Sequence, residues 1–252
     1  MLFRSPGSVG PRAPDVATVR EHEPPRQVVA SGEEDGEYGY QCELAAHGRC
    51  TSATLPRFRG MGTLPPMDRI ALLVVDVQKG FEDPVWGERN NPGAEDNVAA
   101  LVEAWRSHGQ PVVFVRHDGV EAGSPFTPGQ PGNDLDDILT GDPDLFVTKS
   151  VNSAFHGEPD LAQWLRAEGI ERIAVCGIQT NMCCETTARV AANLGFEMDF
   201  VLDATYTFAL PSHDGGTISA HELSRVTAAN LDPEFGRVTS TREAVAALNG
   251  AA

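Results

Sequence analysis

Cys183 stands in a segment whose pattern is that of a strand, a tight turn and a helix. An apolar run over 172–178 predicts the strand, and a helical pattern over 181–194 ends at Gly195, where a left-handed helix cap is expected. Cys183 would therefore lie in the first helical turn, whose free N–H groups and dipole favour a thiolate. A small, buried and inert thiol is the alternative, and the position alone leaves both interpretations open.

An aspartate and a lysine also stand at the ends of predicted strands. The continuous apolar run over 70–77 predicts a buried parallel strand, with Asp76 near its carboxyl end. A shorter strand over 145–148 leads directly to Lys149. Open α/β sheets bind their ligands at the carboxyl ends of the strands, so these two residues and Cys183 are predicted to meet at one edge. A purely structural role is the alternative for Asp76.

The apolar runs and helical patterns alternate along the chain after residue 66. This alternation predicts an α/β fold: a doubly wound, Rossmann-like, six-stranded parallel sheet with helices on both faces. We expect 67–252 to form this domain and 1–66, rich in Pro, Gly and charge, to be a disordered extension. The predicted strands are 70–77, 111–115, 145–148, 172–178, 196–202 and 236–240, and the predicted helices are 95–108, 160–168, 181–194, 219–231 and a last one capped by Ser240 and Glu243.

The string from Gly177 to Glu185 resembles the nucleophile loop of the isochorismatase-like cysteine hydrolases. In that loop the nucleophile is the first cysteine after a Thr-(Asp/Asn/His)-x step, which corresponds to Cys183. The family also carries an aspartate at the end of its first strand and a lysine on a middle strand, which correspond to Asp76 and Lys149. The resemblance extends over about 68–241 and implies the fold described above.

The resemblance implies a thioester mechanism. Asp76 would accept the proton of Cys183, and Lys149 would supply positive charge that favours the thiolate. The thiolate would attack an acyl carbon. The oxyanion would be bound by the backbone N–H groups of Gln179 and Cys183, beside a cis peptide bond between Ile178 and Gln179. Asp76 would then protonate the leaving amine, and water would release the thioester.

The sequence predicts no metal and no other cofactor. Zinc-dependent nicotinamidases of the superfamily carry an Asp-x-His…His set after the second strand. Here that place reads Arg116-His117-Asp118-Gly119, and no second histidine follows until His156. His117 is then either a pocket residue or a structural one. Arg89, His117 and Phe155 are the candidate substrate-binding residues, although Arg89 could equally pin its own loop.

Four loop strings, 86–92, 116–118, 128–133 and 149–157, are most similar to the streptothricin hydrolase branch of the family. That similarity implies opening of the streptolidine lactam, a cyclic amide of a cationic antibiotic. A ureido or carbamoyl amidohydrolase and a metal-free isochorismatase are the alternatives, and retention of Cys183 favours amide hydrolysis. A non-enzymatic binding or redox module is a further alternative, but it would leave the matching aspartate and lysine without a role.

The net charge of −17 lies almost wholly in residues 67–252. Such acidity argues against nucleic acid and anionic membranes as partners, and it is compatible with a cationic small-molecule substrate. Solubility alone would explain it equally well. Five cysteines, an odd number, fit a reducing compartment, and the first residues lack an apolar signal core, so a cytoplasmic location is expected. We also expect a homodimer or a higher homo-oligomer.

Overall fold

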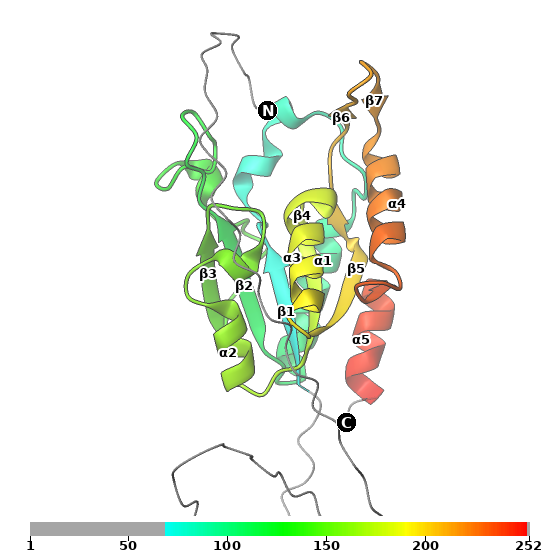
Figure 1. Cartoon of the computed structure of the whole chain (residues 1–252). Helices are drawn as coiled ribbons and strands as arrows, with labels where there is room; N and C mark the ends of the chain where they lie inside the picture. Colours follow the sequence, from blue (N-terminus) through cyan, green and yellow to red (C-terminus); the bar gives the residue numbers. More distant parts are fainter. Residues whose placement is uncertain (1–68, 251–252) are drawn as a thin grey trace, which may run out of the picture. The chain divides into compact units, whose positions relative to one another are not determined.

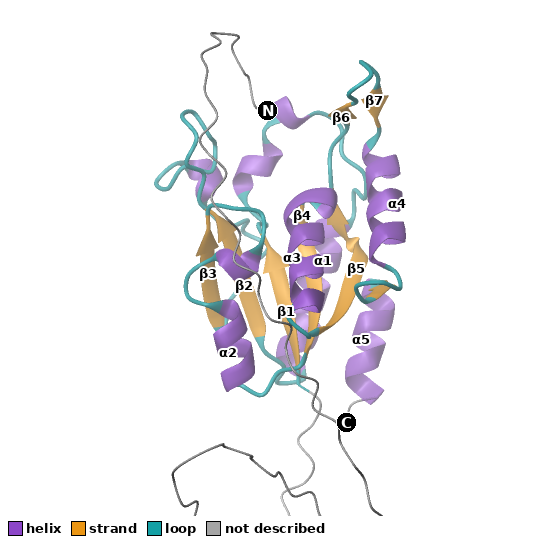
Figure 2. Ribbon diagram, in the orientation of Figure 1, coloured by secondary structure: helices purple, strands orange, loops and turns teal. Residues whose placement is uncertain are grey.

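The computed structural model describes residues 69–250 of the chain. The predictions about 1–66 lie outside these described residues. Within them, six parallel strands form one sheet in the order β3-β2-β1-β4-β5-β8, and helices cover both of its faces (Figures 1 and 2). The predicted doubly wound α/β fold is confirmed. No helix within 69–250 combines the length and the apolar character that crossing a membrane would require.

The elements lie close to their predicted positions. The strands of the main sheet are β1 (Ile70–Val75), β2 (Val112–His117), β3 (Leu145–Lys149), β4 (Arg172–Ile178), β5 (Glu197–Tyr206) and β8 (Arg237–Thr239). The helices are α1 (Ala94–Ser107), α2 (Leu161–Ala167), α3 (Glu185–Asn193), α4 (Ala220–Leu231) and α5 (Thr241–Gly250). A small antiparallel pair that the sequence did not predict, β6 (Leu210–Pro211) and β7 (Thr217–Ile218), follows β5.

Strand β1 is apolar throughout because the sheet is covered on both faces. Successive side chains of a strand point to opposite faces. Leu72 therefore packs in a core with α1 and α5, while Leu73 packs in a second core with α2, α3 and α4. Both side chains are fully buried. The continuous apolar run that predicted this strand is thus the signature of a central parallel strand.

Strand β5 runs to Tyr206, four residues beyond its predicted end. The pairing of β4 with β5 shifts register at this point: Val175 pairs with Phe200, whereas Gly177 pairs with Thr205, so the extra residues lie in β5 before pairing resumes. Gly177 has φ of +120°, and a Cβ atom there would lie 2.0 Å from the carbonyl oxygen of Val75. Only glycine permits this close approach of β4 to β1 directly before the predicted nucleophile loop.

Replacement of Gly177 by alanine should destabilise the fold strongly. The new methyl group meets main-chain atoms that cannot move away, and φ is unfavourable for an L-residue, so the free energy of unfolding should fall by about 3 kcal/mol or more. Gly109→Ala is the matched control, because Gly109 also has positive φ (+64°) but open space around its Cβ position. Its cost should be only about 1 kcal/mol. Urea unfolding of both variants measures the difference, and equal losses would contradict the close approach.

Candidate active site

Three side chains meet at the carboxyl edge of the sheet. Asp76 follows β1, Lys149 is the last residue of β3, and Cys183 lies in the turn after β4. The ammonium Nζ of Lys149 is 2.7 Å from Oδ2 of Asp76 and 3.4 Å from Sγ of Cys183. The structure therefore brings together the three residues that the sequence predicted to meet, from segments about 110 residues apart in the chain.

The aspartate and the lysine form a buried ion pair with one unused oxygen. Asp76 is 0% and Lys149 is 3% exposed. The ammonium contacts Oδ2 of Asp76, whereas Oδ1 has no hydrogen-bond partner among residues 69–250. Burial alone would lower the pKa of Lys149, but the charge and hydrogen bond of Asp76, together with those of Cys183, raise it above its ordinary value. The lysine is therefore a fixed cation, and the carboxylate keeps one free lone-pair site for a proton.

Cys183 rests as a thiol. Burial raises its pKa, the charge of Asp76 raises it further, and Lys149 opposes this rise only in part. The expectation that a position in the first helical turn favours a thiolate is therefore corrected for the resting protein. The residues Thr180–Cys184 form a π-helical turn before α3, so the regular helix begins only after Cys183, and the sulfur lies beside a carboxylate. Its proton needs a local acceptor.

The turn that carries Cys183 is fixed at its start. The peptide bond between Ile178 and Gln179 is cis, as the resemblance implied. The carbonyl oxygen of Gln179 accepts hydrogen bonds from the N–H groups of Met182 and Cys184. The hydroxyl of Thr180 donates to Thr205 at 2.9 Å. These contacts tie the turn to β5 and fix the direction of its backbone N–H groups.

A buried threonine just beyond β5 also holds this turn. The hydroxyl of Thr207 lies 2.5 Å from Oδ1 of Asn181 and 3.3 Å from Oε1 of Gln179. Its backbone N–H donates to the side chain of Asn90, and its carbonyl oxygen accepts from the backbone N–H of the same residue. The role of Thr207 was not predicted from the sequence, because a single hydroxyl that contacts distant segments leaves no periodic pattern.

His117, the last residue of β2, lies beside the ion pair. Its Nδ1 is 3.5 Å from Nζ of Lys149, and Phe126 contacts its ring edge to face. Burial lowers the pKa of His117, and the charge of Lys149 lowers it further. The side-chain amide of Gln78 accepts a hydrogen bond from the backbone N–H of His117 at 2.8 Å and donates one to the carbonyl oxygen of His117 at 3.0 Å. The contribution of Gln78 was not foreseen from the sequence.

One group of side chains has the spacing of a metal site. Single donor atoms of Asp76, His117 and Cys183 lie within 4.8 Å of one another. The ammonium of Lys149, however, lies within 3.5 Å of one atom of each of these residues. A cation carried by the chain therefore already lies among these donors.

Two residues predicted to bind substrate make other contacts. The guanidinium of Arg89 pairs with the carboxylate of Glu95 and stacks 4.2 Å from the ring centroid of Tyr206. These contacts pin the loop before α1, one of the two roles considered for Arg89. Phe155 stacks on Phe196, with ring centroids 5.7 Å apart. Direct contact of Arg89 or Phe155 with substrate stays a prediction.

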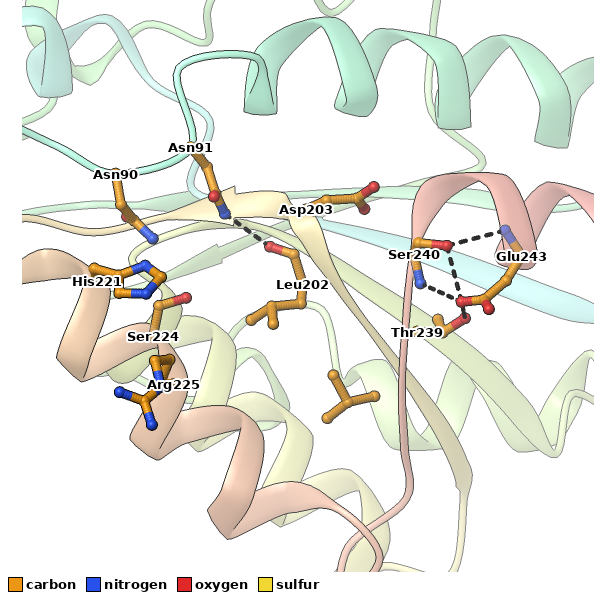
Figure 3. Close-up of a pocket in the computed structure, with 11 residues that line it drawn as sticks. Asn90, Asn91, Leu202, Asp203, His221, Ser224, Arg225, Thr239, Ser240 and Glu243 are labelled. Carbon is orange, nitrogen blue, oxygen red and sulfur yellow. Dashed lines mark hydrogen bonds between the residues drawn. The ribbon is translucent and has the colours of Figure 1, made fainter.

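A separate hollow of about 340 Å³ opens between β5, α4 and the start of α5 (Figure 3). None of the three clustered residues lines it. Its acidic side chains serve as helix caps: Asp203 accepts from the N–H of Thr241, and Glu243 accepts from the N–H of Ser240. The hollow is therefore a feature of the α5 terminus and lies apart from the residues that could do chemistry.

Comparison with known proteins places this arrangement in a family. The isochorismatase domain matches residues 70–243. The chain belongs to the isochorismatase family. An uncharacterized isochorismatase family protein of Bacillus subtilis (strain 168) is 34% identical over 179 residues, which cover 71% of this chain and 95% of that protein.

Two further members of the isochorismatase family bear on the chemistry. A streptothricin hydrolase of Streptomyces noursei is 31% identical over 188 residues, covering 72% of this chain and 71% of that enzyme. The crystal structure of a cysteine hydrolase from Pseudomonas syringae pv. phaseolicola superposes with a TM-score of 0.67 at 29% identity, covering 75% of this chain and 96% of that one. The chain is thus an isochorismatase-family hydrolase.

The exposure and the pKa of Cys183 predict its reactivity. Iodoacetamide should label Cys183 before Cys184 and Cys176, because the latter two are 0% exposed and Cys183 is only partly buried. The labelling rate should still rise above pH 9, since the pKa of Cys183 is raised above its ordinary value of 9.0. Peptide mapping at several pH values measures both. Faster labelling of Cys184, or a rate that levels off below pH 8, would contradict the resting thiol.

Proposed function

We propose that the protein is a cysteine amidohydrolase that opens a cyclic amide through a thioester on Cys183. The observation that carries this proposal is the buried pair of Asp76 and Lys149: one carboxylate oxygen has no hydrogen-bond partner within residues 69–250, and the carboxylate lies within 4.8 Å of the thiol sulfur of Cys183. Acyl transfer by a cysteine requires a nucleophile, a base that takes its proton and a positive charge that stabilises the thiolate. This buried cluster contains all three.

In the proposed first step, the free oxygen of Asp76 takes the proton of Cys183 as sulfur attacks the carbonyl carbon. The ammonium of Lys149 lies close to both groups and stabilises the forming thiolate. The C–N bond then breaks, and Asp76 passes its proton to the leaving nitrogen. In the second step, Asp76 takes a proton from water, which attacks the thioester. The C–S bond breaks, and the thiol regains the proton. The net change is the addition of one water molecule.

The oxyanion formed in both steps needs donors that are already in place. The backbone N–H groups of Gln179 and Cys183 are proposed for this role. Within residues 69–250, no backbone or side-chain group accepts a hydrogen bond from the N–H of Gln179. The hydrogen bonds around the turn keep its backbone fixed, so these donors would not have to reorganise during the reaction.

The proposed substrate is streptothricin, at its streptolidine lactam. Three observations support this: the loop strings described above, the similarity to a streptothricin hydrolase over most of both chains, and the strongly acidic composition. A net charge of −17 attracts a polycation at long range. In a cyclic amide the leaving nitrogen stays attached to the acyl group, so the product is heavier than the substrate by one water and is not split in two.

Purified wild-type protein and Cys183→Ala should therefore be compared against streptothricin, a ureido acid, nicotinamide and isochorismate. We expect the wild type to convert streptothricin to a single product one water heavier, and Cys183→Ala to lose several orders of magnitude in kcat. Cys184→Ala is the control and should keep activity, because that thiol is fully buried. Turnover by Cys183→Ala would refute the thioester, and preference for another compound would reassign the substrate.

Catalysis should also be independent of a metal. The proposed steps use only the carboxylate, the ammonium, the thiol and backbone N–H groups, so prolonged incubation with EDTA should leave kcat and KM unchanged. Metal analysis of the same samples completes the experiment. Stoichiometric zinc that leaves together with activity, and restores it when added back, would contradict the metal-free mechanism.

A further inference from the structure

His117 lies at the end of the strand that separates the two strands leading to Asp76 and Lys149. Strand β2 lies between β1, which leads to Asp76, and β3, which ends at Lys149. His117 and Lys149 are register partners on β2 and β3. Register partners on neighbouring parallel strands project to the same face, and Nδ1 of the imidazole lies 3.5 Å from Nζ of the lysine.

The ring is held in this place by its surroundings. The side-chain amide of Gln78, itself 1% exposed, bonds both to the N–H and to the carbonyl of His117. The amide of Asn133, 2% exposed, donates to the same carbonyl at 3.1 Å. Phe126 contacts the ring from one side, with centroids 6.0 Å apart and planes at 89°. Two buried amides and an aromatic ring therefore restrain a histidine that the proposed mechanism does not yet use.

The ammonium of Lys149 has three N–H donors, and the site offers three acceptors. Asp76 takes one at 2.7 Å and Cys183 another at 3.4 Å. His117 is the third, at the long end of hydrogen-bond distance. The bond is possible only when Nδ1 carries no proton, which puts the proton of the neutral ring on Nε2.

We infer that His117 is a positioning residue, a neutral Nε2–H imidazole whose Nδ1 accepts from Lys149 and directs the ammonium between Asp76 and Cys183. This inference rests on the proposed function, because it gives the histidine a role through the lysine and no contact with the reacting atoms. It extends the earlier expectation of a pocket residue: the ring acts on the catalytic cluster itself.

The charged groups that face the ring determine its response to pH. Lys149 disfavours the imidazolium, whereas Asp76 and, from the loop after β2, Asp118 and Glu121 favour it. Burial and the lysine prevail, so the pKa of His117 lies below its ordinary 6.5. As the pH falls through this lowered pKa, an imidazolium forms beside the ammonium and Nδ1 can no longer accept. Below this pKa, the ammonium of Lys149 should therefore lose its ordered position between Asp76 and Cys183.

Nitrogen-15 NMR of the histidine rings tests the inference without any substrate. The spectrum of His117→Asn identifies the His117 signals by their absence. In the wild type we expect Nε2 protonated, Nδ1 unprotonated and a titration midpoint below 6.5. In Lys149→Met, which removes the neighbouring cation, the midpoint should move upward. A proton on Nδ1 in the wild type, or an unchanged midpoint in Lys149→Met, would overturn the inference.

Kinetics then separate positioning from packing. Asn presents an oxygen acceptor at the place of Nδ1, so His117→Asn should keep kcat within about threefold of wild type and shift the acid limb of its pH profile downward. His117→Leu fills similar space without an acceptor and should lose about tenfold or more in kcat, with little change in KM. Wild-type kcat in His117→Leu, or an unshifted acid limb in His117→Asn, would refute the role.

These outcomes are separable from a failure of the proposed function. Cys183→Ala should be inactive whether or not His117 orders the lysine, so its activity decides the thioester alone. If His117→Leu proves too unstable to assay, the NMR titration of Lys149→Met and the pH profile of His117→Asn still decide the matter.

Discussion

The ion pair of Asp76 and Lys149 connects two strands, β1 and β3, that are not neighbours in the sheet. Removing two charges from water is costly, and a buried pair is seldom more stabilising than apolar side chains of the same volume. Deleting one partner, by contrast, leaves an unpaired buried charge and lowers the free energy of unfolding by about 3–5 kcal/mol. Cys183 and His117 also face the ammonium, and these contacts offset part of the cost of burying the pair. A role in the reaction therefore explains this pair, at the ligand-binding edge of the sheet, better than a contribution to stability does.

The pair also changes what the raised pKa of Cys183 means. Losing the proton to solvent would create a new buried charge next to a carboxylate, which is why burial and Asp76 raise the pKa. Passing the proton to the free oxygen of Asp76 moves a negative charge from oxygen to sulfur and leaves the net charge of the cluster unchanged. The burial that suppresses a resting thiolate therefore opposes this internal transfer far less. The thiol can be inert toward solvent and still reactive toward a bound acyl group.

The sequence predicted the sheet well because its central strands are buried on both faces and show as continuous apolar runs. It also brought Asp76, Lys149 and Cys183 together, since each closes a predicted strand or begins the segment after one. It could not predict the π-helical turn around Cys183 or the contacts of Thr207. Both depend on hydrogen bonds between distant segments, which leave no periodic signal in the chain. The expectation that the helix position favours a thiolate did not include burial and the neighbouring carboxylate, which raise the pKa of Cys183 and exist only in the folded protein.

The proposed mechanism requires a covalent bond between Cys183 and the substrate during turnover. Rapid acid quenching of a reaction with streptothricin, followed by intact-protein and peptide mass spectrometry, measures this most directly. Because ring opening of a cyclic amide keeps both halves attached, the adduct should carry the full mass of the substrate, on the peptide that contains Cys183, and should disappear as the substrate is consumed. Continued turnover without any adduct, or with an adduct on another residue, would contradict covalent catalysis by Cys183.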